Sequence, residues 1–387
     1  MKRWLLIGMA VVVVALAAFF LFAPGIVERS MNRVTPTPLR ITPEARALSS
    51  EVADMHADPL LWDRDLTKRS ASGQVDVPRL IEGGYALQVF SSVTKTPKHQ
   101  NYDANGADSD NITMLAIAQL QPPRTWGSLL QRSLYHAEKL DRFAAKSDGR
   151  LRVIRSPMDV DRLLADRARG AKVVGGMLSI EGLQDLEGDP ANLDRLYAAG
   201  FRMAGFAHFF DTDVAGSMHG LGKGGLTPLG RMVLRRMEAK GMIVDVAHAS
   251  HAAVADMLAM ARRPVVSSHG GVQATCRVNR NLTDDEIRGI ARTGGVVGIG
   301  YWDAAVCSTA PTAVAAAIAH VRDLVGVAHV GLGSDFDGAV TTGFDAAHVA
   351  AVAQALLDRG FTPAEVRAVM GGNVLRVIRA GLVPQRG

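Results

Sequence analysis

The sequence contains little cysteine and no cluster of basic residues. Two cysteines among 387 residues can form one disulfide at most, which excludes a cysteine-rich zinc module and a disulfide-stapled scaffold. The 43 lysines and arginines outnumber the 38 aspartates and glutamates by only five, and they are spread along the chain. This distribution argues against a nucleic-acid-binding protein. Internal repeats are absent, and the only low-complexity segment is an apolar run at the N-terminus.

Apolar residues are abundant. They make up 48% of the chain against 21% charged residues, a composition that supports a large core and excludes a disordered protein. The length of 387 residues exceeds that of a typical domain. It would suggest two or three domains, unless the chain forms a closed α/β barrel of roughly 250 residues with additions.

The N-terminal apolar run predicts a membrane helix. It spans residues 4–22 without a charge and follows Lys2 and Arg3. At about 1.5 Å per residue, this length nearly crosses a hydrocarbon core of roughly 30 Å. The run is long for a signal peptide, and Ala23-Pro24-Gly25 is not a clean cleavage site, so we favour an uncleaved anchor over residues 1–25. The two cations then place the rest of the chain outside the cytoplasm, on the periplasmic or extracellular side. Cleavage would instead give a secreted protein.

Residues 26–49 contain several prolines and are expected to form a stalk, and residues 50–387 are expected to form the folded domain. Within that domain, short apolar runs alternate with longer amphipathic stretches, such as helices predicted at residues 229–240 and 284–292. This alternation is typical of parallel βα units. Eight strands are predicted, at residues 52–56, 86–91, 173–180, 203–208, 242–247, 265–268, 295–300 and 330–334. They indicate an α/β fold, a (β/α)₈ barrel of the TIM type.

Ionisable side chains stand at the ends of six of these eight strands. The C-terminal ends of barrel strands are where such folds carry their chemistry. Four of only 11 histidines in the chain lie there, which chance does not explain well. The residues at the strand ends are His56, Asp58, Glu181, His208, His248, His269 and Asp335.

Five of these residues form a donor set for metal ions. His56 and Asp58 project from one strand end, because alternate residues of a strand share a face. Together with Glu181, His248 and His269 they offer three imidazoles and two carboxylates, which suit zinc. Since one catalytic zinc takes about three protein ligands, we predict two zinc ions that share Glu181 and hold a hydroxide between them.

Each residue also has a purely structural interpretation. His208 lies in an apolar run and could be a core histidine, while Asp335 and Asp337 lie among glycines and could cap a turn. Residues 267–269 read Ser-Ser-His, but no Gly-x-Ser-x-Gly nucleophile elbow accompanies them. Residues 220–225 satisfy the dinucleotide pattern G-x-G-x-x-G without a preceding strand, so we predict a flexible loop near the site instead.

Several short motifs occur in the order and spacing of a known family. They are His56-Ala-Asp58, Asp76-Val-Pro-Arg-Leu80 with Gly83-Gly84, Ile180-Glu181-Gly182, Gly225-Leu-Thr-Pro-Leu-Gly230, Asp245-Val-Ala-His248, Ser268-His269, Arg280-Asn281, Gly333-Ser-Asp-Phe-Asp-Gly338 and Gly372-Asn373. From about residue 50 to residue 380 the chain resembles the membrane dipeptidases, peptidase family M19, of the metal-dependent hydrolase superfamily.

The resemblance implies the same metal ligands as the donor count. His56 and Asp58 would bind one zinc, His248 and His269 the other, and Glu181 would bridge them. One departure is the position of the membrane segment, which is N-terminal here, whereas mammalian members use a C-terminal lipid anchor.

The resemblance also implies substrate-handling roles and a disulfide. His208 matches a histidine that contacts the substrate, and Arg280 matches the arginine that holds the C-terminal carboxylate of the substrate. Asp335 matches the aspartate that moves protons beside the metals, and Cys276 and Cys307 are spaced like a disulfide pair. A substrate-binding tyrosine of the family aligns near Ala304, so that role is not assigned to a residue of this chain.

We therefore expect a membrane-anchored di-zinc enzyme that hydrolyses dipeptides outside the cytoplasm. One alternative is another amide or ester hydrolase of the same superfamily, such as a lactonase or a deacylase, although such substrates need not engage Arg280. Another is a non-catalytic metal-binding scaffold. The expected partners are dipeptides and the membrane, nucleic acid is not expected, and a homodimer is left open.

Overall fold

Nine parallel strands form the central sheet of the computed structural model, which describes residues 2–383. They are β2 (Val52–Ala57), β3 (Tyr85–Val93), β4 (Leu151–Val153), β5 (Val174–Glu181), β6 (Phe201–Gly205), β7 (Ile243–Asp245), β8 (Val265–Ser267), β9 (Val296–Ile299) and β10 (Val330–Leu332). Pairing of β3 with β5, from Leu87 against Gly175 to Val93 against Glu181, closes eight of them into a barrel. The predicted (β/α)₈ barrel is confirmed.

The ninth strand, β4, was not anticipated from the sequence. It pairs with the first residues of β5, Leu151 opposite Val174, whereas β6 pairs with the same edge of β5 further along, Phe201 opposite Leu178. β4 therefore extends one edge of β5 below the barrel without interrupting the ring of eight strands.

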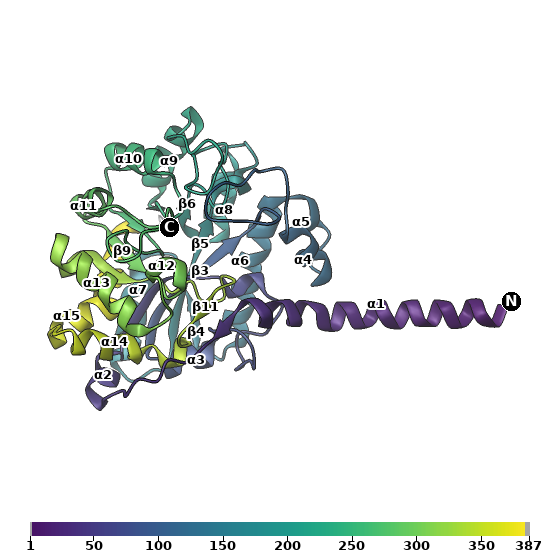
Figure 1. The fold of residues 1–387 in the computed structure, drawn as a ribbon, viewed down its shortest axis with the longest axis horizontal. Coiled ribbons are helices and arrows are strands. Elements are labelled where there is room, and N and C mark those ends of the chain that lie inside the picture. The colour runs from purple at the N-terminus through teal and green to yellow at the C-terminus, as the bar shows by residue number, and fades with distance from the viewer. Residues whose placement is uncertain (1, 384–387) are drawn as a thin grey trace.

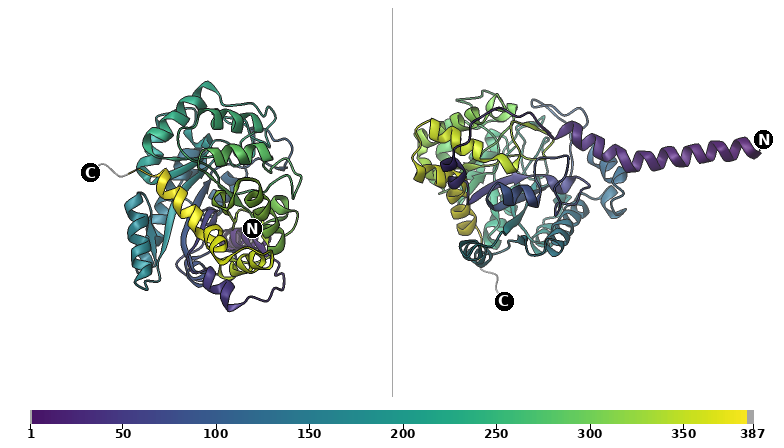
Figure 2. Two further views of the ribbon diagram at one scale, coloured as in Figure 1. Left: turned by 90° about the vertical axis from the view of Figure 1, so that its left-hand side faces the viewer. Right: turned by 90° about the horizontal axis from the view of Figure 1, so that it is seen from below.

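Helices surround the barrel on its outer face (Figures 1 and 2). They are α3 (Val77–Glu82), α4 (Ile112–Ala118), α5 (Arg124–Gly127), α6 (Leu129–Lys146), α7 (Pro157–Ala168), α8 (Asn192–Ala199), α9 (Pro228–Lys240), α10 (His251–Met260), α11 (Asp284–Arg292), α12 (Asp303–Val306), α13 (Pro311–Val325), α14 (Ala350–Asp358), α15 (Pro363–Arg367) and α16 (Asn373–Gly381). The strands are buried along their length, as expected of a parallel sheet with both faces covered.

Local capping explains why two helices match their predicted ranges closely. Thr227 accepts a hydrogen bond from the Gly230 amide at the start of α9, and Gly241, with φ of 68°, ends that helix in the left-handed conformation. Thr283 and Glu286 form a reciprocal capping box at the start of α11.

Five strands end earlier than predicted: β6, β7, β8, β9 and β10 end at residues 205, 245, 267, 299 and 332. Beyond β7, β8 and β10, buried carboxylates accept hydrogen bonds from the backbone in place of a neighbouring strand. The Asp245 carboxylate accepts hydrogen bonds from the Ala247 and Ser268 amides, and Asp54 accepts from the His56 and Ser334 amides. The residues beyond each strand are thereby free to turn their side chains over the end of the barrel.

The N-terminal helix α1 (Lys2–Met31) projects from the domain (Figure 1). Within Arg3–Met31, a stretch of 18 residues has a mean hydropathy of 3.0, and the helix is long and apolar enough to cross a membrane, which fits an anchor or a signal sequence. The helix passes through Pro24 and continues beyond the predicted end at Phe22. Its last turns contact the domain, where Pro24 and Glu28 are buried.

Residues 32–49 lie on the domain, so the predicted stalk is corrected. Strand β1 (Arg33–Val34) pairs with β11 (Thr341–Thr342). The short helix α2 (Pro43–Leu48) buries Ala45 and Leu48, and the residue that caps it, Thr42, donates two hydrogen bonds to the Gln354 side chain. The folded part of the chain thus begins before residue 50.

Candidate active site

The barrel brings all seven predicted strand-end residues to one place. His56 lies in β2 and Asp58 directly follows it, Glu181 ends β5, and the others lie two or three residues beyond β6, β7, β8 and β10. Their exposed fractions range from 1% to 8%, so every one of them is buried. The shared end of a parallel barrel is the reason that residues far apart in sequence meet here.

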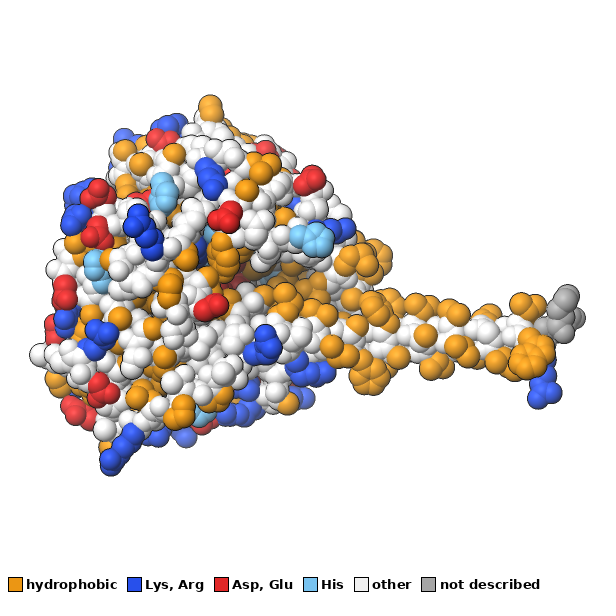
Figure 3. Space-filling model, viewed as in Figure 1, with side chains coloured by type: hydrophobic (Ala, Val, Ile, Leu, Met, Phe, Trp, Pro, Cys, Tyr) orange, Lys and Arg blue, Asp and Glu red, His pale blue; other side chains and the backbone are white. Residues whose placement is uncertain are grey.

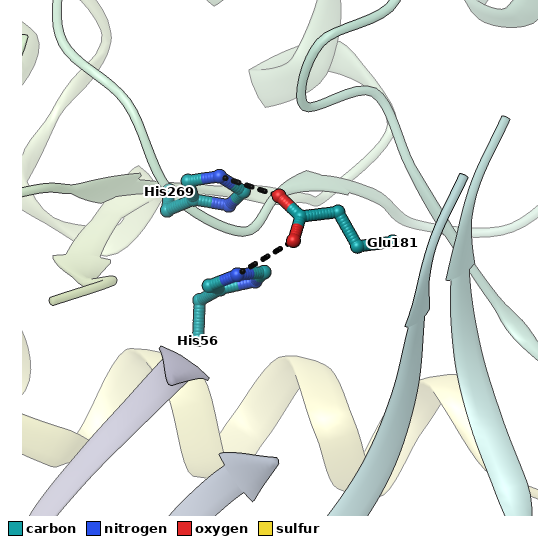
Figure 4. A group of neighbouring side chains, drawn as sticks. All are labelled: His56, Glu181 and His269. Atoms are coloured by element: carbon teal, nitrogen blue, oxygen red, sulfur yellow. Dashed lines mark ion pairs between the residues drawn. The ribbon is translucent and has the colours of Figure 1, made fainter. Parts of the chain in front are cut away.

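The Glu181 carboxylate directs one oxygen toward the His56 ring and the other toward the His269 ring (Figure 4). Its Oε2 atom lies 3.6 Å from Nε2 of His56. Its Oε1 atom lies 2.9 Å from Nε2 of His248, 3.3 Å from that of His269 and 3.4 Å from that of His208. The two carboxylate oxygens therefore face two different sets of donors, as a bridging ligand requires.

Three overlapping groups of side chains could each hold a metal ion, with candidate ligand atoms within 4.8 Å of one another. The groups are His56 with Glu181 and His269; Glu181 with His208 and His248; and His56 with Asp58 and Asp335. All five predicted ligands belong to these groups. His208 and Asp335 belong to them as well, although the sequence assigned these two residues to substrate and proton handling.

The electrostatics of the group call for an added cation. Burial raises the pKa of Asp335 well above its usual range, and the charges of Asp58 and Glu181 add to that rise. Burial lowers the pKa of His56, but the same two carboxylates outweigh it and raise that pKa well above its usual value. A proton on His56 therefore offsets part of the negative charge of the two carboxylates, as a bound divalent ion would. Burial and the Arg280 charge lower the pKa of His248, which keeps it neutral, as a metal ligand must be.

Unpaired polar atoms also fit metal ions. Among residues 2–383, His56 Nε2 and Asp58 Oδ1 are buried without a hydrogen-bond partner, which is costly unless another ligand satisfies them. The neighbouring residues orient the rings: the Ser268 hydroxyl lies 2.8 Å from Nδ1 of His269, and its backbone amide donates to Asp245. Such outer contacts are typical of metal-binding histidines.

Two of the strand-end residues adopt left-handed backbone conformations. His248 has φ of 63° and Asp335 has φ of 59°, a region that residues other than glycine adopt rarely and at some cost. Gly338 follows Asp335 so closely that a Cβ there would lie 2.0 Å from Asp335 Oδ1 and 2.9 Å from Asp58 Oδ2. The backbone at residue 338 therefore approaches the carboxylates too closely for a side chain to fit there.

A cavity of about 470 Å³ opens onto these residues. Asp58, Glu181, His208, His248 and Asp335 line it, and so do aromatic and apolar residues that include Tyr102, Phe209, Trp302, Leu61 and Trp62. The cavity thus joins a charged, metal-type donor set to apolar surface, and its size suits a small ligand.

Arg280 lines the same cavity and is only 2% exposed. Its Nη2 atom donates to the His269 carbonyl at 2.9 Å, and its guanidinium lies 5.8 Å from the centre of the Trp302 ring. Its Nε atom has no partner among the described residues. A fixed positive charge with spare donors therefore stands beside the donor set.

The disulfide between Cys276 and Cys307 is present. It joins the segment after β8, which carries Arg280, to the end of α12 after β9. The sequence did not single out Arg64, whose guanidinium pairs with Asp337 and with Glu28.

Tyr102 was also missed. It lies in the long segment between β3 and α4, lines the cavity, and its hydroxyl accepts a hydrogen bond from Nε1 of Trp302. These contacts join distant loops, and no local pattern signals them.

The glycine-rich residues 220–225 were expected to be flexible and near the site. The Asp211 carboxylate instead accepts hydrogen bonds from the Gly222 and Lys223 amides, and none of these six residues lines the cavity.

The chain is similar to one protein family and to several curated relatives. A family model described as membrane dipeptidase (peptidase family M19) matches residues 44–383. The dipeptidase aclJ of Aspergillus oryzae is 29% identical over 354 residues, which cover 84% of this chain and 77% of the relative. An uncharacterized protein of Klebsiella pneumoniae is 34% identical over 212 residues, or 51% of this chain and 76% of that protein.

Solved structures share the fold. A probable dipeptidase from Pseudomonas aeruginosa matches with a TM-score of 0.73 at 20% identity, over 87% of this chain and 97% of that one. A metallopeptidase from Rhodobacter sphaeroides, liganded with a phosphinate mimic of the dipeptide L-Ala-D-Ala, matches with a TM-score of 0.66 at 23% identity, over 86% and 99%.

Proposed function

Because the chain belongs to the membrane dipeptidase family, peptidase family M19, and is a metallo-dipeptidase, we propose that it hydrolyses dipeptides with two zinc ions bound at the end of the barrel. The observation that carries this proposal is the position of Glu181 between two sets of donors, with one carboxylate oxygen toward His56 and the other toward His248 and His269.

His56, Asp58 and Glu181 would hold one zinc, and His248, His269 and Glu181 would hold the other. The mixture of imidazole and carboxylate donors, the neutral state of His248 and the unpaired Nε2 atom of His56 support this division. When bound, the ions would supply Lewis acidity toward the scissile carbonyl and would bring a shared water toward ionisation near neutral pH.

Asp335 would take the proton of the attacking water and deliver it to the departing amine. Its Oδ1 atom lies 3.9 Å from Nε2 of His56, and its side chain lines the cavity, so it reaches both the donor set and the space for substrate. The left-handed backbone at Asp335 holds the carboxyl in that position.

His208 would stabilise the negative charge that develops on the carbonyl oxygen. Its Nε2 atom lies 3.4 Å from Glu181, and its ring lines the cavity. His208 also belongs to a potential ligand group with Glu181 and His248, and the two roles differ in one measurable way. A substrate-contacting residue can be replaced by alanine with the metal content retained.

Arg280 would bind the free carboxylate of the dipeptide. Its guanidinium is permanently charged and presents a planar fork of donors that matches a carboxylate. Since this charge stands beside the metal ligands, only a carboxylate one residue beyond the scissile bond can reach it. That geometry favours dipeptides over longer peptides.

The apolar helix would anchor the enzyme, with residues 1–25 in the membrane segment and the barrel outside the cytoplasm. The charges of Lys2 and Arg3 before the apolar run support this orientation. Cleavage of the helix as a signal peptide would instead release the enzyme as a secreted protein.

A dipeptide panel on the full-length protein, before and after chelation, tests the proposal. Hydrolysis that disappears with the chelator and returns with zinc is expected, with about two zinc ions per chain. His248→Ala should lower the metal content and abolish turnover, while His320→Ala, at a histidine that pairs with Asp284 away from the cavity, should change neither. Full metal content and turnover in His248→Ala would refute the assignment. Faster cleavage of lactones or N-acyl substrates would favour another hydrolase of the superfamily.

A further inference from the structure

We propose that Val27 and Met31 form part of the wall of the substrate cavity and help select the side chains of the dipeptide. They belong to residues 27–32, the end of helix α1 together with the residue after it, here called the helix foot. The inference rests on the proposed dipeptidase function. It assigns to the membrane helix a role in substrate recognition in addition to anchoring.

The first support is the lining of the cavity. Val27 and Met31 of the helix foot line it together with five apolar residues that also contact one another, Leu61, Trp62, Val93, Ile112 and Leu115. We call these seven residues the apolar wall. Figure 3 shows the apolar surface of the helix continuing onto the domain beside a hollow. Three of the proposed metal ligands, Asp58, Glu181 and His248, line the same cavity, so a substrate at the metals would lie within reach of the apolar wall.

The second support is that buried polar contacts fix the helix foot in place. Glu28 is only 4% exposed, and its carboxylate forms an ion pair with Nε of Arg64 at 2.8 Å. Arg64 also pairs with Asp337. The Asn32 side-chain oxygen accepts a hydrogen bond from the Ala339 amide at 2.8 Å. Asp337 and Ala339 follow Asp335 in the same loop, so the helix foot is attached to the segment that carries the proposed proton carrier.

The third support is the exposure of the two apolar side chains. Val27 is 40% exposed and Met31 is 42% exposed, although both lie where the helix contacts the domain. Residues 4–22, the run expected to cross the membrane, already span roughly 28 Å at about 1.5 Å per residue, and Val27 and Met31 lie further along the same helix. An apolar substrate side chain in the cavity would cover these two side chains.

The helix foot is an addition of this chain to the shared fold. The family model begins to match at residue 44, after the helix foot has ended. A selectivity that depends on Val27 and Met31 would therefore not follow from family membership.

Kinetics of the full-length protein in nanodiscs of one lipid composition test the inference. The variant combines Val27→Ala and Met31→Ala, and the substrates are Leu-Ala, Ala-Leu and Ala-Ala. We expect kcat/KM for at least one of the leucine dipeptides to fall about tenfold, chiefly through KM, because a pocket discriminates by roughly this factor when apolar contacts are removed. Ala-Ala should change less than twofold.

A matched control combines Ile26→Ala and Ser30→Ala, two exposed positions of the same helix that do not line the cavity. This control should behave as the unmodified enzyme with all three substrates. A second variant, Met31→Glu, places a negative charge in the apolar wall. It should raise kcat/KM for a lysine-containing dipeptide relative to its leucine counterpart by about tenfold.

Equal changes for all substrates in the Val27 and Met31 variants, or changes no larger than in the control, would overturn the inference and leave the proposed function intact. An unmodified enzyme that hydrolyses no dipeptide would overturn both. Loss of bulky substrates in the alanine variant together with a gain of lysine dipeptides in Met31→Glu would support the inference.

Discussion

At the scale of single residues, the charge of Arg280 acts in two directions. Toward the barrel it lowers the pKa of His248 and His269, in addition to the effect of their burial, and so favours neutral imidazoles. Toward the cavity it presents donors that, in the proposed function, would bind a substrate carboxylate. Burial lowers the pKa of Arg280, and the nearby Asp335 carboxylate opposes this shift. Removing the guanidinium should therefore affect substrate binding first.

We predict that Arg280→Ala lowers kcat/KM for free dipeptides by roughly ten- to a hundredfold, the usual range for a charge-assisted hydrogen bond of about 1.5–3 kcal/mol. C-terminally amidated dipeptides, which lack the charged partner, should change little. For free dipeptides, kcat/KM of Arg280→Lys should lie between those of the unmodified enzyme and Arg280→Ala, because lysine keeps the charge and loses the fork of donors. The measurement is kcat/KM for matched free and amidated dipeptides.

A structural role predicts a different pattern. If Arg280 serves mainly to donate to the His269 carbonyl, both substrate classes should lose equally and the melting temperature should fall. Equal losses with unchanged metal content would contradict the carboxylate clamp and leave the metal assignment standing.

Asp185 offers a test of pH-dependent stability away from the proposed metals. Burial raises its pKa to about 7, the Glu187 charge adds to the rise, and a hydrogen bond from the Ser133 hydroxyl at 2.6 Å opposes it. Between the ordinary pKa near 3.8 and pH 7, the folded chain holds a proton that the unfolded chain has released. Stability from this group is therefore greatest at low pH and falls as the pH rises through that window.

We predict that Asp185→Asn, which cannot ionise, raises the melting temperature more at pH 8 than at pH 5, relative to the unmodified protein. Melting curves at the two pH values give the comparison. Asp148→Asn, at a side chain that is 91% exposed, is the control and should show no such difference. The same shift at both pH values for Asp185→Asn would show that its ionisation does not affect folding.

At the scale of the elements, the disulfide links two loops at the end of the barrel. Cys276 and Cys307 are 31 residues apart, and the segment between them includes Arg280, α11 and β9. Closing a loop of this length restricts the unfolded chain, a contribution of roughly 3–4 kcal/mol in the chain-entropy description.

We predict that replacing both cysteines by serine lowers the unfolding free energy by about this amount, measured by denaturant titration. Reduction of the unmodified protein should have the same effect, which serves as the control. Two free thiols in the protein purified from an oxidising compartment would contradict the prediction.

The sequence predicted the elements better than their ends. All eight barrel strands and the helices α9 and α11 were found, because periodicity and capping residues are local signals. The strand ends at Asp245 and Leu332 were missed. There the carboxylates of Asp245 and Asp54 accept hydrogen bonds from the Ser268 and Ser334 amides, which ends the pairing between strands.

Contacts across the chain account for the other differences. The pairing of Arg33 with Thr341 and the contact of Asn32 with Ala339 join residues about 300 positions apart, and no local pattern in a proline-containing segment signals them. Likewise, the residue types at the strand ends identified His208 and Asp335, but only the folded chain places them in the potential ligand groups.

At the scale of the whole molecule, the position of a truncation should decide more than solubility. Deleting residues 1–22 removes the run predicted to cross the membrane and keeps the helix foot, whereas deleting residues 1–33 also removes the contacts of Glu28 and Asn32. Both shortened proteins should be recovered without detergent.

We predict that only the longer deletion destabilises the protein, by about 1–3 kcal/mol, because it removes the ion pair of Arg64 with Glu28 and leaves the half-buried Ala339 amide without its acceptor. It should also reduce the preference for leucine over alanine dipeptides. Denaturant titrations and kcat/KM ratios of the two proteins are the measurements. Identical stability and selectivity would show that the contacts of residues 23–33 contribute neither.

The direct passage of helix α1 into the domain has a consequence for how the enzyme would meet peptides while the helix is retained. In the described part of the chain, only Asn32 separates helix α1 from strand β1, which pairs with β11. A flexible linker between the helix and the barrel is therefore absent from these residues. The opening of the cavity would then stand at a fixed distance from the membrane, with Met31 roughly 14 Å beyond Phe22 along the helix. Such an enzyme would act on peptides in a thin layer of solution next to the bilayer, so its turnover would depend on which peptides enter that layer.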